Sequence, residues 1–380
     1  MYYVTVREPP KYHQMTLDEV LFLDDPQIRG PLMNTYNTHT YEFPYIGWKF
    51  RNRANVGQMI GLLECFNAET AHLREVPRAS LYREFSIPKK TGGLRRISAP
   101  NDELMYALRR LKSIFEDSFR VLWHTSAFAY TKGRSTVTAV KRHQANESRW
   151  FAKFDMKDFF GSTTQEFVMA MFRRIYPFAL IMESRRGSEA LETALSLCFL
   201  NGGLPQGTPI SPLITNIMMV PIDFRMTQVF RDFDRKNFVY TRYADDFVIS
   251  CRYDFDLAAV EKQIDDILHE FGAPFGIKRE KTHYGSNAGS NWILGLMLNK
   301  DNNITVGYKR KREFARMLHN YVMDRKNGTP WPLEDIQTME GQRSYYAMVE
   351  GEPFSKMVSD LGKKLGVDIM ALIREDLRTA

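Results

Sequence analysis

The chain has 380 residues, 44% hydrophobic and 26% charged, which suits a globular protein with two or three subdomains around a sizeable core. Its 52 Lys and Arg against 45 Asp and Glu give a net charge of +7, a weak indication of an anionic partner. Three scattered cysteines fit neither a disulfide framework nor a zinc site. The start "MYYVTVREPP" has no signal-peptide pattern, and no apolar run approaches the roughly 18 residues of a membrane span. We therefore expect a cytoplasmic protein with no membrane partner.

The first third of the chain predicts three kinds of segment. Residues 1 to about 75 mix aromatics, Asn and Pro without clean periodicity, so we expect an irregular extension that ends in a short helix around "VGQMIGLLECF". "YREFSIPKKTGGLRRISAP" predicts a basic β-hairpin, because two strand-like runs flank a Gly pair. In "ELMYALRRLKSIFEDSF", helical spacing of Leu104, Leu108, Leu111 and Phe115 predicts a helix.

The middle third predicts a strand, a helix, a hairpin and a second helix. "WFAKFDMKDFF" is a strand-like run, and "STTQEFVMAMFRRI" carries a helical stripe behind Ser and Thr caps. After the Gly/Pro loop "NGGLPQGTPISP", Ser211 and Pro212 suit the cap and first position of a helix. "NFVYTRY" and "DFVISCR" read as a hairpin, and Gly272 ends the helix of "DLAAVEKQIDDILHEF". This order indicates an α+β layer rather than a parallel βαβ series. Beyond residue 305 the chain is helical and basic.

Two adjacent carboxylates, Asp245 and Asp246, interrupt the apolar hairpin "YTRYADDFVIS". Taken alone, such a pair is most often ordinary solvated turn chemistry. A divalent cation is the alternative, because magnesium prefers oxygen ligands and completes its shell with substrate phosphates. Asp155, at the end of the preceding strand, supplies a third carboxylate, which we expect within ~10 Å of the pair if ions ~4 Å apart are held there.

These segments, in order, resemble the motif series of reverse transcriptases. "IPKKTGGLRRI" and "AFAYTKGRST" resemble the fingers motifs, "FDMKDFF", "LPQGTPISP" and "YADDF" the palm motifs, "FGIKREKTHY" and "WILGLML" the segments that follow, and "GQRSYYAMV" a thumb helix. The resemblance implies a right-hand polymerase of α+β class, with fingers, a palm with an antiparallel sheet, and a helical thumb. Its expected division is an N-terminal extension (1–78), fingers (79–150), palm (151–290, with a helical insertion at about 162–200), and primer grip and thumb (291–380). The compact length resembles bacterial retron and defence-associated enzymes.

In that family the catalytic step adds a dNTP to a primer 3′ hydroxyl and releases pyrophosphate. The resemblance implies two Mg²⁺ ions, with Mn²⁺ as a possible substitute. Asp155 and Asp245 would be their ligands, and Asp246 would support the site. Lys281, in "KREKT", would protonate the leaving pyrophosphate, although a surface lysine is the rival interpretation.

The resemblance also implies a dNTP site and a primer and template site. Lys89, Lys90 and Arg95 of the fingers turn would clamp the triphosphate, and the backbone at Asp158 and Phe159 would approach it. The Phe160 ring would exclude a ribose 2′ hydroxyl, and Gln206 and Gly207 of the glutamine loop would lie against the base and sugar. The primer and template side would comprise Tyr243, Leu294, Gly295, Lys309, Arg310, Lys311 and Arg312.

One residue departs from the family pattern. Pro221 falls where the helix after the glutamine loop normally continues, so we expect that helix to kink or end there.

The implied partners are a non-coding RNA template, a DNA or RNA primer and dNTPs, with a homo-oligomer or an effector protein as further options, in antiphage defence or a retron-like element. Two alternatives stay open. The same acids would serve DNA synthesis without a template or on one short repeated template. A catalytically idle RNA-binding scaffold would be expected to lose an acid or the glutamine loop, and this chain keeps both.

Overall fold

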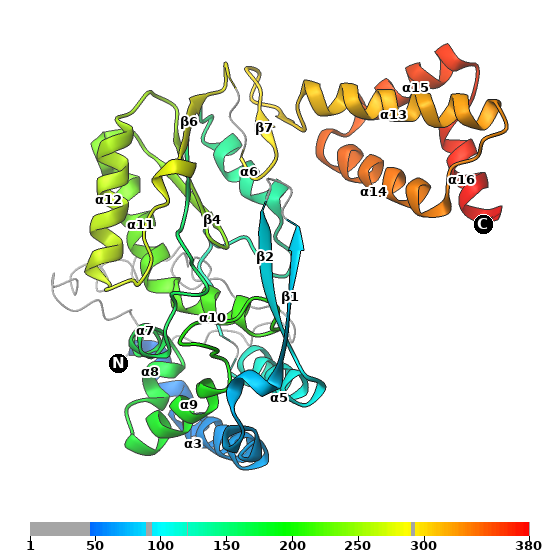
Figure 1. Ribbon diagram of the computed structural model, residues 1–380. Helices are drawn as coiled ribbons and strands as arrows, with labels where there is room; N and C mark the ends of the chain where they lie inside the picture. Colours follow the sequence, from blue (N-terminus) through cyan, green and yellow to red (C-terminus); the bar gives the residue numbers. More distant parts are fainter. Residues whose placement is uncertain (1–45, 89–92, 120, 290–292, 380) are drawn as a thin grey trace.

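The computed structural model describes residues 46–88, 93–119, 121–289 and 293–379. Within these ranges a four-stranded antiparallel sheet lies between helices, and two two-stranded hairpins flank it. Figure 1 shows the N-terminal helices below the sheet and a separate helical lobe, coloured orange to red, at the C-terminal end. The predicted α+β class, with the antiparallel sheet and helical C-terminal region of a right-hand polymerase, is confirmed.

The N-terminal helix is longer than the sequence predicted. Helix α3 spans Ile46–Glu69, twenty-four residues rather than the short helix expected around 56–66. Its buried residues Leu63 and Phe66 belong to the main hydrophobic core, and the helix packs against α8 (Phe178–Ile181) and α9 (Arg185–Ser196). Short turns follow at α4 (His72–Glu75) and η1 (Arg78–Leu81).

The basic hairpin is present where it was predicted. Strand β1 (Tyr82–Pro88) pairs with β2 (Leu94–Pro100), and Lys89 and Lys90 at its tip lie outside the described residues. Helix α5 (Asp102–Ser113) begins after Asn101, whose side chain accepts a hydrogen bond from the Leu104 N–H, and continues into a π-helical turn (Ile114–Ser118). Its four predicted core residues are all buried.

The central sheet has the strand order β4–β5–β3–β6. Its strands are β3 (Trp150–Asp155), β4 (Val239–Tyr243), β5 (Asp246–Cys251) and β6 (His283–Ser286). Because successive side chains point to opposite faces, Phe154 and Phe247 enter the main core while Phe151 and Val248 enter a second core shared with the C-terminal lobe. Helix α6 (Thr136–Ala145) contributes Val137 to that second core.

Several helices lie between β3 and β4. Helix α7 (Gln165–Phe172) is capped by the Thr164 side chain, and α8 and α9 follow. Ser211 is the first residue of α10 (Ser211–Met218) and not its cap, because its hydroxyl donates to the Pro205 carbonyl at 3.0 Å and so stays with the preceding loop. The predicted break at Pro221 is confirmed: α10 ends and α11 (Val220–Asp232) begins around Met219. A short turn, η3 (Phe233–Arg235), leads to β4.

Helix α12 (Leu257–Glu270) ends before Gly272, whose φ of +64° favours glycine, as expected. A short turn, η4 (Arg279–Lys281), leads into β6, and a small hairpin of β7 (Met297–Leu298) and β8 (Ile304–Thr305) leads to the lobe. The lobe consists of α13 (Tyr308–Lys326), α14 (Leu333–Glu350), α15 (Glu352–Leu365) and α16 (Ile369–Thr379). Of the helices in the described ranges, none combines the length and the apolar character needed to cross a bilayer.

Candidate active site

The three acidic residues meet at one corner of the central sheet. Asp155, the last residue of β3, is the register partner of Asp246, the first residue of β5. Residues paired in this way have Cα atoms about 4.5–5.5 Å apart, well inside the expected limit. The Met156 N–H donates to the Asp245 carbonyl at 3.1 Å, so Asp245 lies beside the same strand end. Ala244, with a φ of +58°, makes the tight turn that brings the pair to this corner.

Two lysines hold the carboxylates at this corner. The Lys281 ammonium lies 3.0 Å from Asp155 Oδ2, and the Lys153 ammonium lies 2.9 Å from Asp246 Oδ1. Lys153 was not among the predicted site residues. Its position two residues before Asp155 on a strand was the available signal, because residues i and i+2 share one face of a sheet.

The corner carries negative charge that the protein only partly compensates. Burial raises the pKa of Asp245, and the adjacent Asp246 charge raises it further. Burial also raises the pKa of Asp246, although Lys153 opposes that shift. A hard cation suits such a cluster of oxygen donors, because it would relieve both the burial and the repulsion. Over the described residues, no group of three or more His, Cys, Asp or Glu side chains is arranged so that it could hold a metal ion by itself, so substrate or water would have to supply part of the coordination shell.

The turn after β3 and the glycine-rich loop before α10 pack backbone against backbone. The Leu204 N–H donates to the Phe160 carbonyl at 2.9 Å, and a Cβ at Gly203 would lie 2.0 Å from the Gly161 carbonyl oxygen. The Phe159 ring is buried against Phe275, with centroids 4.8 Å apart, so the ring belongs to the core. The Phe160 ring is partly buried at the edge of the core. Asp158, at a φ of +47°, keeps its side chain exposed.

The glutamine loop is attached to the basic hairpin. The Ser98 N–H donates to the Gln206 carbonyl at 2.9 Å. Gly207 has a φ of +118°, and a Cβ there would lie 2.9 Å from Ile97 Cγ2, so only glycine allows this approach. These contacts fix the base of the hairpin beside the loop, and Arg95 is exposed on β2.

Tyr130 is a second site residue that the sequence did not single out. Its φ is +59° and its side chain is 59% exposed. Loss of water around the hydroxyl, followed by the nearby Asp245 charge and Tyr243, raises the pKa of Tyr130, while Arg95 lowers it. Tyr130 therefore lies within electrostatic reach of both the hairpin and the acidic corner. The positive φ could not be anticipated, because a tyrosine rarely adopts it.

Of the residues predicted for the primer and template, Tyr243 lies in the central sheet, whereas Leu294 and Gly295 lie in a turn before the C-terminal lobe. Tyr243 pairs with Asp246 at the end of β4. Leu294 and Gly295, both at positive φ, form a tight turn closed by the Ile293–Leu296 bridge, and the Arg310 side chain donates to the Gly295 carbonyl.

The basic run that opens α13 contains two side chains that bind within the protein and two that are exposed. Lys311 pairs with Glu350 at 2.9 Å, and Arg310 is committed to the Gly295 turn. Lys309 and Arg312 are exposed.

Comparison with known proteins gives a consistent picture. Residues 87–311, more than half of the chain, match the family model of reverse transcriptase (RNA-dependent DNA polymerase). The chain is 30% identical over 236 residues to the Retron Ec73 reverse transcriptase of Escherichia coli, covering 59% of this chain and 71% of that protein. It is 27% identical over 311 residues to the Retron Mx162 reverse transcriptase of Myxococcus xanthus, covering 76% of this chain but only 62% of that relative's length.

Among solved structures, apo telomerase from Candida tropicalis aligns with a TM-score of 0.42 at 12% identity, covering 78% of this chain and 62% of that one. The assignment rests on the family model, whose matched residues 87–311 include the acidic corner described above, and on the retron relatives. This chain belongs to the reverse transcriptase (RNA-dependent DNA polymerase) family, among the bacterial retron-type enzymes.

Proposed function

We propose that the protein is an RNA-directed DNA polymerase that extends a primer with dNTPs in the cytoplasm by two-metal phosphoryl transfer. The observation that carries the proposal is the register pairing of Asp155 with Asp246, with Asp245 at the same strand end. Family membership supports the reaction class. Burial of both carboxyl groups, which raises their pKa, favours this proposal over a solvated turn.

The three acids are the proposed ligands of two Mg²⁺ ions, with Mn²⁺ as a substitute. The bound ions would supply positive charge where the transferred phosphate becomes more negative. Lys153 and Lys281 orient Asp246 and Asp155. The Lys281 ammonium, whose pKa is raised by its hydrogen bond to Asp155, is protonated at neutral pH as any lysine is, and it would give that proton to the leaving pyrophosphate.

The proposed nucleotide site lies between the hairpin and the glutamine loop. Arg95, with Lys89 and Lys90, would clamp the triphosphate. Phe160 would contact the sugar and exclude a 2′ hydroxyl, which makes DNA the product. The hydrogen bond between Ser98 and Gln206 supports this arrangement, because it holds the hairpin beside the loop.

The direct test is incorporation of dNTPs on a primed RNA by the purified chain and its Asp245→Ala variant. We expect template-matched DNA from the unchanged chain and none from the variant. Asp301→Ala, at an exposed turn residue, is the control that keeps full synthesis. Synthesis by Asp245→Ala would remove the site assignment. A homopolymer or short repeat would favour the untemplated alternative, and RNA binding without incorporation in either metal would favour the idle scaffold.

The biological part of the proposal is a dedicated non-coding RNA partner in a retron-like or antiphage defence system. It rests on kinship with proteins named as retron reverse transcriptases. Sequencing of RNA that co-purifies with the chain tests it: one dominant RNA is expected, and a random sample of cellular RNA would contradict it. Phage plating with and without Asp245→Ala tests the defence role.

A further inference from the structure

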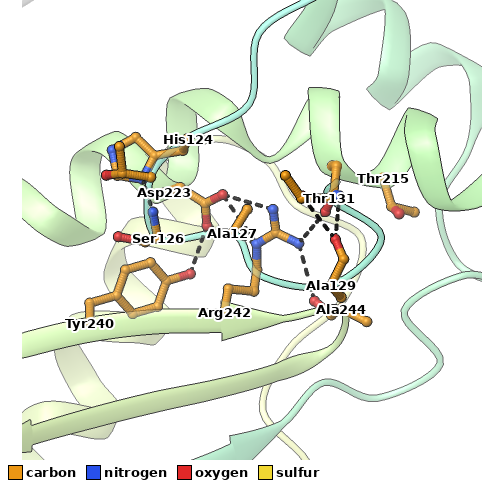
Figure 2. Close-up of polar contacts among 12 residues, drawn as sticks. His124, Ser126, Ala127, Ala129, Thr131, Thr215, Asp223, Tyr240, Arg242 and Ala244 are labelled. Atoms are coloured by element: carbon orange, nitrogen blue, oxygen red, sulfur yellow. Dashed lines mark hydrogen bonds and ion pairs between the residues drawn. The ribbon is translucent and has the colours of Figure 1, made fainter. Parts of the chain in front are cut away.

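A buried ionic network lies on the face of the sheet opposite to Asp155 and Asp246. Along β4 the side chains alternate, so Thr241 and Tyr243 share the face of Asp246 while Tyr240 and Arg242 point the other way. The Arg242 side chain is fully buried and faces Asp223 of α11, whose side chain is fully buried too (Figure 2). The mechanism proposed above uses neither residue.

The Arg242 guanidinium binds the Asp223 carboxylate with two of its nitrogens. Nε donates to Oδ1 and Nη2 donates to Oδ2, each at 2.8 Å. The Tyr240 hydroxyl donates to Oδ1 at 2.8 Å. Burial, with the Asp223 charge, raises the pKa of Tyr240 well above its usual range, so the hydroxyl remains a donor. Planar, two-point geometry of this kind fixes the orientation of the guanidinium as well as its position.

The third nitrogen connects this pair to the catalytic turn. Nη1 donates to the Ala244 carbonyl at 3.3 Å and to Asn216 Oδ1 at 3.2 Å. Ala244 immediately precedes Asp245 and holds the left-handed conformation of the turn. A donor on the Ala244 carbonyl therefore acts on the peptide bond that leads directly into Asp245.

The loop that leads to Tyr130 also forms hydrogen bonds with the network. The Asn216 amide donates from Nδ2 to the Ala129 carbonyl at 2.7 Å. The backbone of Arg242 accepts from the Phe128 N–H at 2.8 Å and donates to the Ser126 carbonyl at 2.6 Å. Figure 2 shows the loop and the guanidinium meeting between the strand and the helices. Arg242 is thus held by both its backbone and its side chain.

Stability alone is a weak reason to bury such a pair. Desolvation of two charges offsets most of their attraction, and well-packed apolar residues often serve stability equally well. Because Arg242 Nη1 also donates to the Ala244 carbonyl, this pair has a clearer role in fixing the conformation of the turn that carries Asp245. Magnesium requires near-ideal octahedral geometry and so depends on how its ligands are held.

We propose that Arg242, oriented by Asp223 and Asn216, is a positioning residue that fixes the Ala244–Asp245 turn and so sets the metal affinity of the acidic corner. The inference rests on the proposed function, because it assigns the corner to metal ions. It extends that function to residues that touch neither metal nor substrate.

The test uses two variants of the full chain. Arg242→Lys keeps the charge but loses the planar fork that reaches Asp223, Asn216 and Ala244 together. Asp223→Asn combined with Arg242→Gln keeps hydrogen-bonding amides but removes both buried charges, so this variant avoids an unpaired charge. Arg225→Lys is the matched control, because it lies on the same helix α11 and pairs with Glu270 at 3.2 Å, away from the turn.

Three measurements are made on each variant: the Mg²⁺ concentration for half-maximal incorporation, Mn²⁺ binding by electron paramagnetic resonance without nucleotide, and hydrogen exchange of the Met156 amide, which donates to Asp245. We expect both network variants to need ~10-fold or more metal and to exchange the Met156 amide faster. The control should match the unchanged chain, and circular dichroism should show all of them folded.

Folded variants with unchanged metal binding and unchanged Met156 exchange would overturn the inference and leave the network a purely stabilising one. If Arg242→Lys does not fold, the neutral double variant decides by the same measurements. Should both fail to fold, the network is required for folding and the positioning role is rejected. Absence of synthesis by the unchanged chain would count against the proposed polymerase, whereas Mn²⁺ binding and exchange would still judge the network.

Discussion

The interior around the central sheet and the interior of the C-terminal lobe are built differently. Around the sheet the chain buries polar and charged side chains, among them His143, Asp223, Thr241, Arg242 and Ser250. In the described part of the lobe, residues 308–378, the buried residues are hydrophobic apart from Gly362. Ion pairs of the lobe such as Arg325–Asp376 lie at partly exposed edges, and the nearly buried Glu350 side chain, 5% exposed beside Lys311, is the exception within the described part of the lobe.

This difference reflects what each region has to hold in place. Hydrophobic packing is non-directional and tolerates substitutions that conserve volume. A buried polar network is directional, because each donor and acceptor must find its partner or carry a large penalty. Under the proposed function, the sheet orients three carboxylates, whereas the lobe presents a surface to nucleic acid. We therefore expect changes around the sheet to act on chemistry and changes in the lobe to act on stability and affinity.

The largest expected effect is on catalysis at the acidic corner. Asp155→Asn should lower dNTP incorporation by ~10³-fold or more, because it removes charge where the metal and phosphate meet. Its thermal unfolding temperature should stay close to that of the unchanged chain. Asp360→Asn, which removes an equivalent charge from α15, should leave incorporation unchanged. Comparable losses in the two variants would remove the distinction between the regions.

In the lobe, the largest expected effect is on stability. The Phe314 ring packs against Tyr346 and Phe354, with centroids 5.4 and 5.6 Å away. Phe314→Ala should lower the free energy of unfolding by ~3–5 kcal/mol, and Phe314→Leu by ~1 kcal/mol, as measured by urea denaturation. The Mg²⁺ concentration that the folded protein needs for half-maximal dNTP incorporation should not change. A shifted Mg²⁺ dependence would show that the lobe core also sets the acidic corner.

The next effect in size is a pH dependence of the free energy of unfolding, which we expect from the interior around the sheet and not from that of the lobe. His143 donates or accepts at Ser250 Oγ (2.6 Å) and Thr241 Oγ1 (2.8 Å), and burial lowers its pKa to about 3. Between about pH 6.5 and 3 the unfolded chain binds a proton at this histidine and the folded chain does not. Stability attributable to His143 is therefore present above pH 6.5 and is lost as the pH falls, by up to ~1.4 kcal/mol per pH unit.

The measurement is urea denaturation from pH 7 to 4. His143→Gln should flatten this dependence, whatever its effect at neutral pH. His319→Gln, at an exposed position on α13 of the lobe, should leave the dependence intact. An equal slope in all three proteins would mean that the acid loss arises elsewhere.

The smallest expected effect is on nucleic-acid affinity at the start of α13. Lys309→Ala with Arg312→Ala should weaken duplex binding and reduce the slope of log affinity against log salt concentration by ~1–2, one for each lost phosphate contact. Lys311→Ala should change that slope less, because its ammonium is already paired with Glu350. Fluorescence anisotropy over a salt series measures both. A larger effect from Lys311 would place the duplex on the other face of the helix.

Elements with strong local signals were predicted well from the sequence. The hairpin with Asp245 and Asp246, the helix ended by Gly272 and the break at Pro221 all appear where expected, because turns, caps and proline act through neighbouring residues. The errors arose where distant contacts decide. Helix α3 extends well beyond its predicted length while packing on α9, and Ser211 joins the helix while its hydroxyl binds the preceding loop.

The sequence by itself determined which residue types and which strand ends carry the proposed chemistry, because adjacent carboxylates in an apolar hairpin repel each other unless a cation compensates their charge. It also determined the family, through the order of its motifs. Only the tertiary structure decided which groups contact those carboxylates and the turn between them: Lys153 at Asp246, Lys281 at Asp155, and Arg242, paired with Asp223, at the Ala244 carbonyl. A residue type limits the interactions that a side chain can make, but partners from separate helices and strands are chosen only when the chain packs and buried charges must be satisfied.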